Sequence, residues 1–429
     1  MTTLLFENVR LIDPASGLDE PGRLLVKDGR IAGRDRAGAE GAPEAAAVID
    51  GGGAVLCPGL VDMRVEIGEP GHEYRETVSS ASRAAFAGGV TSVAVLPTGT
   101  PAIDDPAMVR LLCSRGQAAD TVSLLPYGAL TKGCRGEELA EIGLLAEAGA
   151  VAFTDGAKAV GPARLMRQAL TYARAFDAMV VQHPEEPSLA GAGCATDGEL
   201  AVRLGLPGIP TAAEAIMIAR DIRLAELTKG RLHFGHVSTA EGVELIRQAK
   251  ARGLNVTCDT APPYFDLNET AIGNFRTWSK LSPPLRPEAD RQAVCAGLAD
   301  GTIDAIASDH TPRDADDKRL PFAQAAAGGT GLATLLAITL ARVHDGTLGL
   351  SDALALMTSR PARLLRSAAG TLATGALADL CLFAPDRIWQ IIAKDLPGQA
   401  HNTPFDGRAV EGKVLGTWKA GVRVFGDAP

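Results

Sequence analysis

The sequence has few cysteines, and none of them is spaced like half of a pair. Its seven cysteines are odd in number, lie far apart and include no Cys-x-x-Cys motif. This pattern excludes a disulfide framework and a cysteine-ligated zinc site, both of which show cysteines at short, regular spacings. We therefore expect the cysteines to be small, buried apolar side chains in a reducing compartment.

Positive charge and long apolar segments are also scarce. Lysine and arginine number 42 against 51 acidic residues, which gives a net charge of −9, and no basic run stands out. An acidic surface repels phosphate backbones and anionic lipid headgroups, so nucleic acids and membranes are not expected partners. No apolar stretch reaches the roughly 18 residues of a membrane-spanning helix, and the N-terminus lacks the basic start of a signal peptide. We expect a cytoplasmic protein.

Apolar residues are plentiful and follow a regular rhythm. They make up 46% of the 429 residues, and between residues 59 and 307 short runs rich in Val, Ile, Leu and Phe alternate with segments of helical period. There are eight such runs: 61–67, 91–96, 121–127, 150–154, 178–182, 231–236, 255–259 and 303–308. Eight alternations of strand and helix predict the α/β class and a parallel (β/α)8 TIM barrel. A doubly wound open sheet is the alternative that this pattern leaves open.

Both ends of the chain are rich in strands instead. Strands are predicted at 4–12, 23–28, 30–32, 48–49, 54–56, 380–383, 414–418 and 422–425, and a loose loop at 36–46. The simplest arrangement joins the two ends into one small domain, with the barrel inserted between them. The prediction is a composite β-sandwich of residues 1–56 plus 366–429 and a barrel of residues 57–365.

Polar side chains that can bind metal follow four of the predicted barrel strands. Asp155 follows the fourth strand, His183 the fifth, His236 the sixth and Asp309 the eighth. The C-terminal ends of barrel strands meet at one mouth, where the working residues of such barrels lie. One histidine there is more often structural than a ligand, but a set of this kind indicates descent from a metal site.

Seven phrases of the sequence carry a specific resemblance. They are PGLVDM at 58–63, EPG at 69–71, GALTKG at 128–133, HVST at 236–239, PPLR at 283–286, DAIASDH at 304–310 and NTPF at 402–405. In this order they resemble the dihydroorotases of the amidohydrolase superfamily over nearly the whole chain. The resemblance implies a barrel with a composite β-sandwich and a zinc centre that activates water against a cyclic amide. Dihydroorotate and carbamoyl aspartate are the two ends of the implied reaction.

The chain departs from the family pattern at the end of its first barrel strand. The family has His-x-His there, which holds zinc, and an arginine two residues later, which grips the substrate carboxylate. Arg64 and Glu66 stand in place of the histidines, and Gly68 stands in place of the arginine. A permanently charged guanidinium cannot ligate a cation. Glu66 still offers an oxygen ligand, so the sequence does not exclude a metal strictly.

Other positions around the mouth depart as well. Thr98 and Ser282 stand where the family has asparagines, and Arg313 stands where it has a substrate-facing histidine. Gly156 replaces the second of two neighbouring carboxylates after the fourth strand. The substituted substrate-pocket positions are Arg64, Glu66, Gly68, Thr98, Ser282 and Arg313. We therefore predict that the side chains that bind the substrate and half of the metal ligands are lost together.

The remaining metal-capable residues predict little metal binding. His183, His236, Asp309 and Asp155 are interpreted as remnant ligands, and Asp309 also as a vestigial general base, the role that the family gives it. A catalytic zinc usually needs three protein ligands and an open position. Since Asp309 cannot easily hold a metal and move a proton, we expect no cofactor, and at most one zinc per chain.

These observations predict a catalytically inactive dihydroorotase-like protein of pyrimidine biosynthesis. The resemblance suggests that it is a structural partner of the aspartate carbamoyltransferase catalytic chain, and a homo-oligomer is expected. Two alternatives stay open at this point. One is an active zinc-dependent cyclic amidohydrolase with an altered, one-metal site, and the other is a regulator that binds a ligand in the old pocket.

Overall fold

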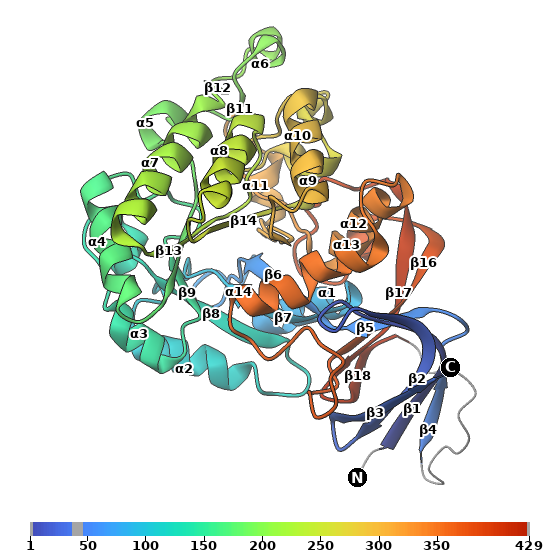
Figure 1. The fold of residues 1–429 in the computed structure, drawn as a ribbon. Coiled ribbons are helices and arrows are strands. Elements are labelled where there is room, and N and C mark those ends of the chain that lie inside the picture. The colour runs from blue at the N-terminus through green and yellow to red at the C-terminus, as the bar shows by residue number, and fades with distance from the viewer. Residues whose placement is uncertain (1–2, 37–45, 427–429) are drawn as a thin grey trace.

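The computed structural model describes residues 3–36 and 46–426, and its larger part is a barrel (Figure 1). Eight parallel strands are hydrogen-bonded in chain order, and a bridge between Val65 and His310 joins the first strand to the last. The strands are β6 (Leu60–Val65), β7 (Val90–Val95), β8 (Ser123–Ala129), β9 (Ala152–Thr154), β10 (Met179–Gln182), β13 (Arg231–Phe234), β14 (Val256–Thr260) and β15 (Ala305–Ile306). The predicted TIM barrel is confirmed, because a doubly wound sheet does not close on itself.

Helices surround the strands. The helices are α1 (Val78–Ala87), α2 (Pro106–Arg115), α3 (Ile142–Ala148), α4 (Ala163–Arg174), α7 (Ala212–Thr228), α8 (Ala240–Ala251), α10 (Glu288–Ala299), α12 (Leu335–His344), α13 (Leu350–Met357) and α14 (Ser359–Leu364). In α4 the buried side chains recur at helical spacing, and this apolar stripe packs on the barrel. The helix α3 begins at Ile142, after a segment in which Leu139 forms a bridge with Thr131.

Short elements follow several strands and extend the mouth. A small lobe after β10 protrudes at the top of Figure 1. It consists of α5 (Pro187–Ala190), β11 (Ala195–Thr196), α6 (Glu199–Leu204) and β12 (Gly208–Ile209). The other short elements are α9 (Pro262–Asp266), α11 (Ala315–Arg319) and the 3-10 helices η1 (Lys132–Cys134), η2 (Glu269–Ile272), η3 (Thr277–Ser279), η4 (Leu332–Thr334) and η5 (Ala393–Asp395).

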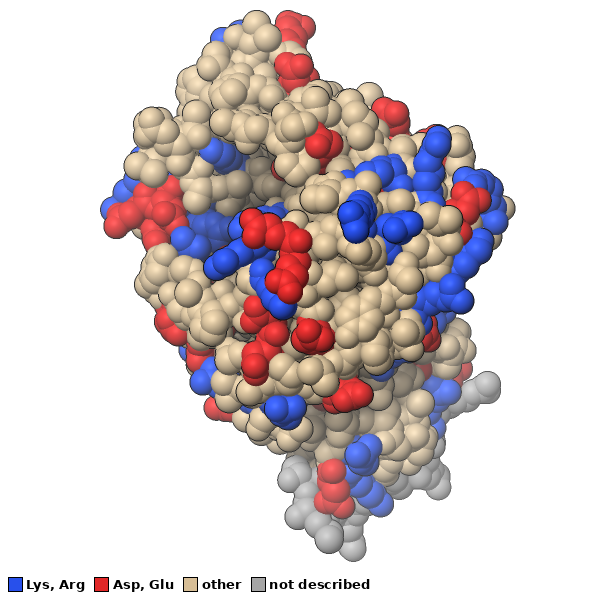
Figure 2. Space-filling view, turned by 90° about the vertical axis from the view of Figure 1, so that its left-hand side faces the viewer, with Lys and Arg blue, Asp and Glu red and all other residues tan. Residues whose placement is uncertain are grey.

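The surface carries both signs of charge. On the face shown in Figure 2, lysine and arginine side chains lie among aspartates and glutamates, without one broad basic field. Across residues 3–36 and 46–426, no helix combines the length and apolar character needed to cross a bilayer. All seven cysteines lie in these ranges, and all are free thiols, five of them buried and two half-buried.

A second sheet unites the two ends of the chain. Its order is β18-β17-β16-β5-β1-β2-β3, with β4 beside β1. The strands are β1 (Thr3–Asp13), β2 (Leu18–Lys27), β3 (Arg30–Arg36), β4 (Ala47–Asp50), β5 (Val55–Pro58), β16 (Leu380–Gln390), β17 (Ala409–Lys419) and β18 (Val422–Phe425). Hydrogen bonds join them into one continuous mixed sheet, where we expected a sandwich. The composite origin is confirmed, whereas the exact domain boundaries stay a prediction, and most of the loop predicted at 36–46 lies outside the described residues.

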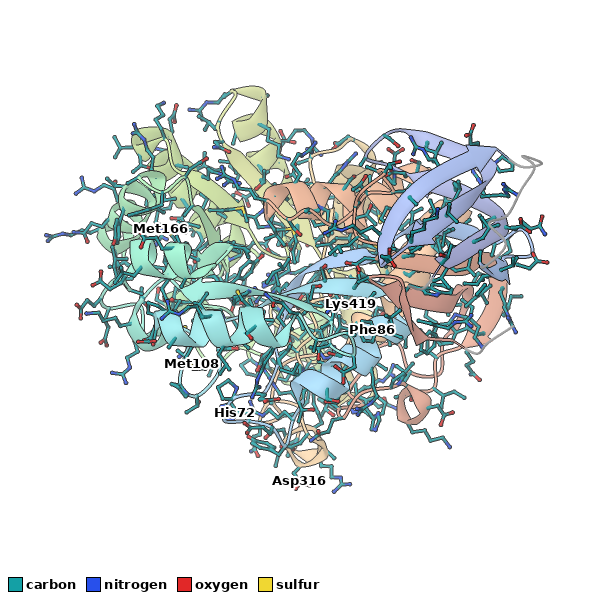
Figure 3. All side chains as sticks on the ribbon, turned by 90° about the horizontal axis from the view of Figure 1, so that it is seen from below. His72, Phe86, Met108, Met166, Asp316 and Lys419 are labelled. Carbon is teal, nitrogen blue, oxygen red and sulfur yellow. The ribbon has the colours of Figure 1, made fainter. Side chains whose placement is uncertain are left out.

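The composite sheet and the barrel share a core. Cys57 of β5 and Phe383 of β16 belong to the same apolar cluster as the barrel helices. Lys419 and Phe86 lie between the two parts in Figure 3. The Lys419 ammonium group donates to the carbonyls of Gly116 (2.6 Å) and Ala118 (2.9 Å), and Thr417 Oγ1 donates to the carbonyl of Phe86 (2.7 Å). The last long strand is therefore fastened to the barrel by apolar packing and by hydrogen bonds to loop carbonyls.

Candidate functional site

The polar residues predicted to converge do lie at one end of the barrel. His183 follows β10, His236 follows β13 and Asp309 follows β15, and all three are buried. The two imidazoles share a hydrogen bond between His183 Nδ1 and His236 Nε2 (3.1 Å). Each of these two nitrogens is therefore already used by the other ring.

Arg64 lies among the strand ends at this mouth. Its side chain is 5% exposed, and Nε donates to Asp309 Oδ1 at 2.8 Å. Nη2 lies 3.4 Å from the Gly156 carbonyl, and a Cβ on Gly235 would lie only 3.6 Å from Nη1. The guanidinium thus reaches from the end of β6 toward the segments that follow β9, β13 and β15. A fixed positive charge occupies the place where the family resemblance implies a metal ligand.

The charge of Arg64 affects the groups around it. Burial raises the pKa of Asp309, and the neighbouring guanidinium acts against this rise. Burial, followed by the positive charge of Arg64, lowers the pKa of His236 well below its usual range. The mouth therefore combines the fixed cation of Arg64, its carboxylate partner Asp309 and the neutral imidazole of His236.

The other carboxylates of the site have partners of their own. Asp155 accepts hydrogen bonds from Thr131, from the backbone N–H at 2.9 Å and from Oγ1 at 2.5 Å. Glu66 receives two bonds from the Arg313 guanidinium, at 2.9 and 3.2 Å. Two positions that the sequence marks as substituted thus form one bidentate ion pair, and Asp155 serves the loop after β8.

The arrangement does not fit a zinc centre. In the described part of the chain, His183, His236, Asp155 and Asp309 supply no set of three ligand atoms within 4.8 Å of one another. The nitrogens that face each other are hydrogen-bonded, and each carboxylate is held by Arg64 or Thr131. His183 Nε2 and His236 Nδ1 have no hydrogen-bond partner, and Glu185 Oε1 lies 3.6 Å from His183 Nε2, but among the described residues these atoms do not form a set of three within 4.8 Å.

The positions implied for substrate binding are small and closely packed. A Cβ on Gly68 would lie 2.1 Å from the His72 carbonyl oxygen, so an arginine there requires the following loop to move. Thr98 Cγ2 would lie 2.4 Å from a Cβ on Gly156, and Thr98 Oγ1 is buried without a hydrogen-bond partner. Ser282 is half-buried. None of these three residues offers a charged group to a substrate carboxylate.

One buried acid joins two of the family phrases and was missed from the sequence. Glu214 of α7 accepts hydrogen bonds from Ser238 Oγ (2.5 Å) and Thr239 Oγ1 (2.7 Å), and Arg286 Nε donates to Ser238 Oγ (3.0 Å). The phrases at 236–239 and 283–286 thus meet at one carboxylate. A glutamate in an amphipathic helix gave no signal of this role, because its pattern is also that of a solvated face.

The pairing of the substituted residues was missed as well. The sequence marks Arg64, Glu66 and Arg313 as departures, but it does not state that Arg64 pairs with Asp309 and Glu66 with Arg313. Their opposite charges were the available signal. His233, for which the sequence suggests no partner, is bound by Asp259 (2.9 Å) and Thr257 (2.8 Å) in the barrel interior.

Comparison with known proteins places the chain in a family. The family model described as Dihydro-orotase-like matches residues 53–242. A protein from Pelobacter propionicus named dihydroorotase is 45% identical over 422 residues, which cover 98% of this chain and 99% of that protein. This chain belongs to the dihydroorotase family. A second dihydroorotase, from Syntrophus aciditrophicus, is 43% identical with the same coverage.

The same fold also appears in solved structures of a hydantoinase and a dihydropyrimidinase. The L-hydantoinase (dihydropyrimidinase) from Arthrobacter aurescens matches with a TM-score of 0.88 and 25% identity, over 100% of this chain and 98% of that one. The dihydropyrimidinase from Brevibacillus agri matches with a TM-score of 0.84 at 22% identity, which shows the fold alone. The barrel with a sheet built from both termini is therefore shared across these proteins.

Proposed function

We propose that this dihydroorotase-family protein acts in pyrimidine biosynthesis without dihydroorotase turnover, as a structural partner of the aspartate carbamoyltransferase catalytic chain. The observation that carries the loss of turnover is the buried ion pair between Arg64 and Asp309. A general base must be free to accept a proton from the attacking water. Here the carboxylate of Asp309 is held by a guanidinium that cannot be deprotonated in proteins.

The binding of substrate supports the same proposal. A substrate with two carboxylates needs a cationic grip, and bidentate arginine contacts supply much of the affinity in such sites. Gly68 offers no side chain, and Arg313 is engaged by Glu66. The two features that dihydroorotase chemistry needs, a free base and a free cation, are each neutralised inside the protein.

The partner is inferred from the family resemblance and from what a chain without turnover can still offer. Its helical outer ring is large enough for standard interfaces of about 800 Å² on each side. We propose that it associates with the transferase catalytic chain and with further copies of itself. The mixed surface charge of Figure 2 supports contacts with a moderate salt dependence.

An active enzyme is the second candidate, and the comparisons favour it more directly than they favour an inactive one. Relatives that are 42–45% identical over nearly the whole chain bear the name dihydroorotase. In this candidate the protein is a zinc-dependent cyclic amidohydrolase with an altered, one-metal site. His183 Nε2 and His236 Nδ1 make no hydrogen bond, and Glu185 Oε1 lies 3.6 Å from His183 Nε2, so these atoms support it as candidate ligands.

Turnover separates the two candidates. The untagged protein, supplied with zinc, is assayed with dihydroorotate and with carbamoyl aspartate, next to the Asp309→Ala variant. We expect both proteins to stay at the background rate. Turnover by the unmodified chain that is lost in Asp309→Ala would contradict the proposal and establish the active enzyme.

Assembly tests the partner. The chain is co-expressed with the aspartate carbamoyltransferase catalytic chain, and the product is sized by light scattering. We expect a stable complex that contains both chains. A monomer that neither co-purifies with the transferase nor changes its activity or stability would contradict this part of the proposal.

A further inference from the structure

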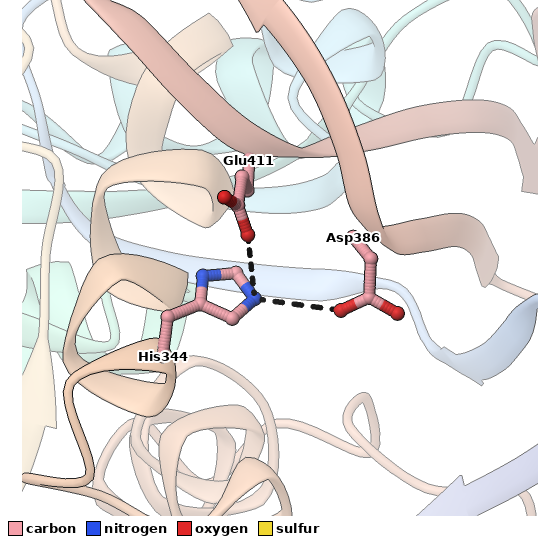
Figure 4. Close-up of side chains that lie close together, drawn as sticks. All are labelled: His344, Asp386 and Glu411. Atoms are coloured by element: carbon pink, nitrogen blue, oxygen red, sulfur yellow. Dashed lines mark ion pairs between the residues drawn. The ribbon is translucent and has the colours of Figure 1, made fainter.

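A histidine and two carboxylates meet on the surface where the barrel joins the composite sheet. His344 is the last residue of α12, Asp386 lies in β16 and Glu411 lies in β17. His344 Nε2 is 3.8 Å from Asp386 Oδ1 and 3.6 Å from Glu411 Oε2. Figure 4 shows both carboxylates pointing at this one nitrogen. Among the described residues, this is the one group of three potential ligand atoms that lie within 4.8 Å of one another.

We propose that His344, Asp386 and Glu411 bind a divalent transition-metal ion, with Zn²⁺ as the occupant. The separations of 3.6 and 3.8 Å exceed those of hydrogen bonds, which lie at about 2.7–3.2 Å. Two ligands that are each about 2.0–2.1 Å from a tetrahedral zinc are roughly 3.3 Å apart. The two separations from Nε2 therefore need to close by only a few tenths of an ångström, and all three atoms already lie within 4.8 Å of one another.

The fold holds the three ligands from three different elements. The pairing of β16 with β17 shifts register between Ala384 and Ile388, and Asp386 lies in this bulge, while Ile388 pairs with Glu411. Gly412 has a φ of +97°, and a Cβ there would lie 2.3 Å from Leu340 Cδ1. The missing side chain thus lets β17 approach α12. The bulge and the glycine together bring two strand carboxylates to the end of the helix.

The electrostatics and the donor set favour a cation. The two carboxylates carry two negative charges, and the C-terminal end of α12 adds its partial negative charge. Arg342, two residues earlier on the helix, pairs with Asp345 and Asp266 and not with this cluster. One imidazole nitrogen and two carboxylate oxygens suit zinc and leave a fourth position for water. The ion would join a barrel helix to the composite sheet, which is a structural role independent of the proposed function.

Zinc titration of the metal-free, untagged, full-length protein tests the site. Calorimetry at pH 7.5 should show one Zn²⁺ per chain and a higher melting temperature when zinc is bound. His344→Ala, Asp386→Asn and Glu411→Gln should each weaken binding by about tenfold or more, since each removes one of three ligands. His401→Ala, which removes an exposed histidine elsewhere, is the matched control and should bind like the parent.

Three outcomes overturn the site. If the parent shows no saturable zinc binding, the cluster is not a zinc site. If binding persists unchanged in His344→Ala, the ion lies elsewhere. Binding that persists in His344→Ala but disappears in His183→Ala would place the ion in the barrel and would also count against the inactive candidate. Co²⁺ provides a second reading, because its visible spectrum should change on binding to the parent but not to His344→Ala.

Discussion

One guanidinium group sets the electrostatics of the barrel mouth. Arg64 and Asp309 are 5% and 10% exposed at their side chains, so water screens their interaction little. Breaking such a pair leaves a buried charge without a partner, which costs more than the intact pair contributes. Arg64, which stands where the family has a metal ligand, thus also stabilises the buried carboxylate of Asp309.

Arg64→Ala should therefore destabilise the protein. We expect a loss of about 3–5 kcal/mol in the free energy of unfolding, the usual cost of removing one partner from a buried pair. Arg247→Ala breaks an exposed pair with Asp300 and should cost about 0–1 kcal/mol. Urea unfolding of the three proteins measures both. Equal, small losses in the two variants would contradict the buried pair.

Asp62 predicts a pH dependence of stability. Burial raises its pKa to about 6, although Oδ1 accepts the backbone N–H groups of Arg64 and Ser308. Because the folded state holds the proton more tightly than the unfolded state, this group lowers stability as the pH rises from about 4 to about 6. The full effect is about 3 kcal/mol, from the shift of roughly two units above the ordinary value.

Asp62→Asn removes this titration. Relative to the variant, the parent should lose stability between pH 4 and pH 6 and should show no further relative change above pH 7. Urea unfolding at four pH values measures the difference, and Asp316→Asn, at an exposed position, serves as the control. A constant difference between parent and Asp62→Asn across this range would show that Asp62 does not titrate there.

At the scale of elements, the bulged pair of β16 and β17 decides how the composite sheet meets the barrel. Trp389 Nε1 donates to the Gly412 carbonyl (2.9 Å), and Gly412 faces Leu340 of α12. A positive φ and a close neighbour both require glycine at this position. The strands predicted from the sequence, 380–383 and 414–418, both stop short of this bulge, which depends on the helix that packs against the strands.

Gly412→Ala should cost more than the same change at Gly375. Both glycines have positive φ values, +97° and +88°, but a Cβ on Gly375 would meet nothing within 4 Å. The Gly375→Ala variant therefore measures the backbone cost alone, on the order of 1 kcal/mol. The excess cost in Gly412→Ala, read from urea unfolding, reports the contact with Leu340. No excess would contradict the close approach of β17 and α12.

At the scale of the whole molecule, the two parts of the chain share one apolar core. Side chains of β5 and β16 lie in the same cluster as those of the barrel helices, and Lys419 fastens the last long strand to barrel carbonyls. A shared core couples the unfolding of the parts, whereas a small polar interface would let them unfold separately.

Calorimetry should therefore show one thermal transition for the barrel and the composite sheet together. Lys419→Met should lower the melting temperature, because it leaves the carbonyls of Gly116 and Ala118 without this donor, and the transition should stay single. Lys394→Met, at an exposed lysine, is the control. Two separate transitions in the parent would contradict the common core.

The sequence by itself determined the class of fold and the place of the site. Alternating apolar runs predict strand and helix locally, and eight alternations leave few ways to bury the strands other than a closed barrel. The rule that strand ends meet at one mouth then places His183, His236 and Asp309 together, as the structure does. The sequence also determined which positions depart from the dihydroorotase pattern, since each departure is a change of residue type within or next to a family motif.

The tertiary structure alone decided what the departures do to one another. Arg64 and Asp309 are separated by 245 residues, and Glu66 and Arg313 by 247, so no local pattern links them. The same holds for His344, Asp386 and Glu411, which meet because a bulge and a glycine bring strands to a helix end. Local patterns set the backbone, but an ion pair or a ligand set depends on distances below 4 Å between segments that only folding brings together.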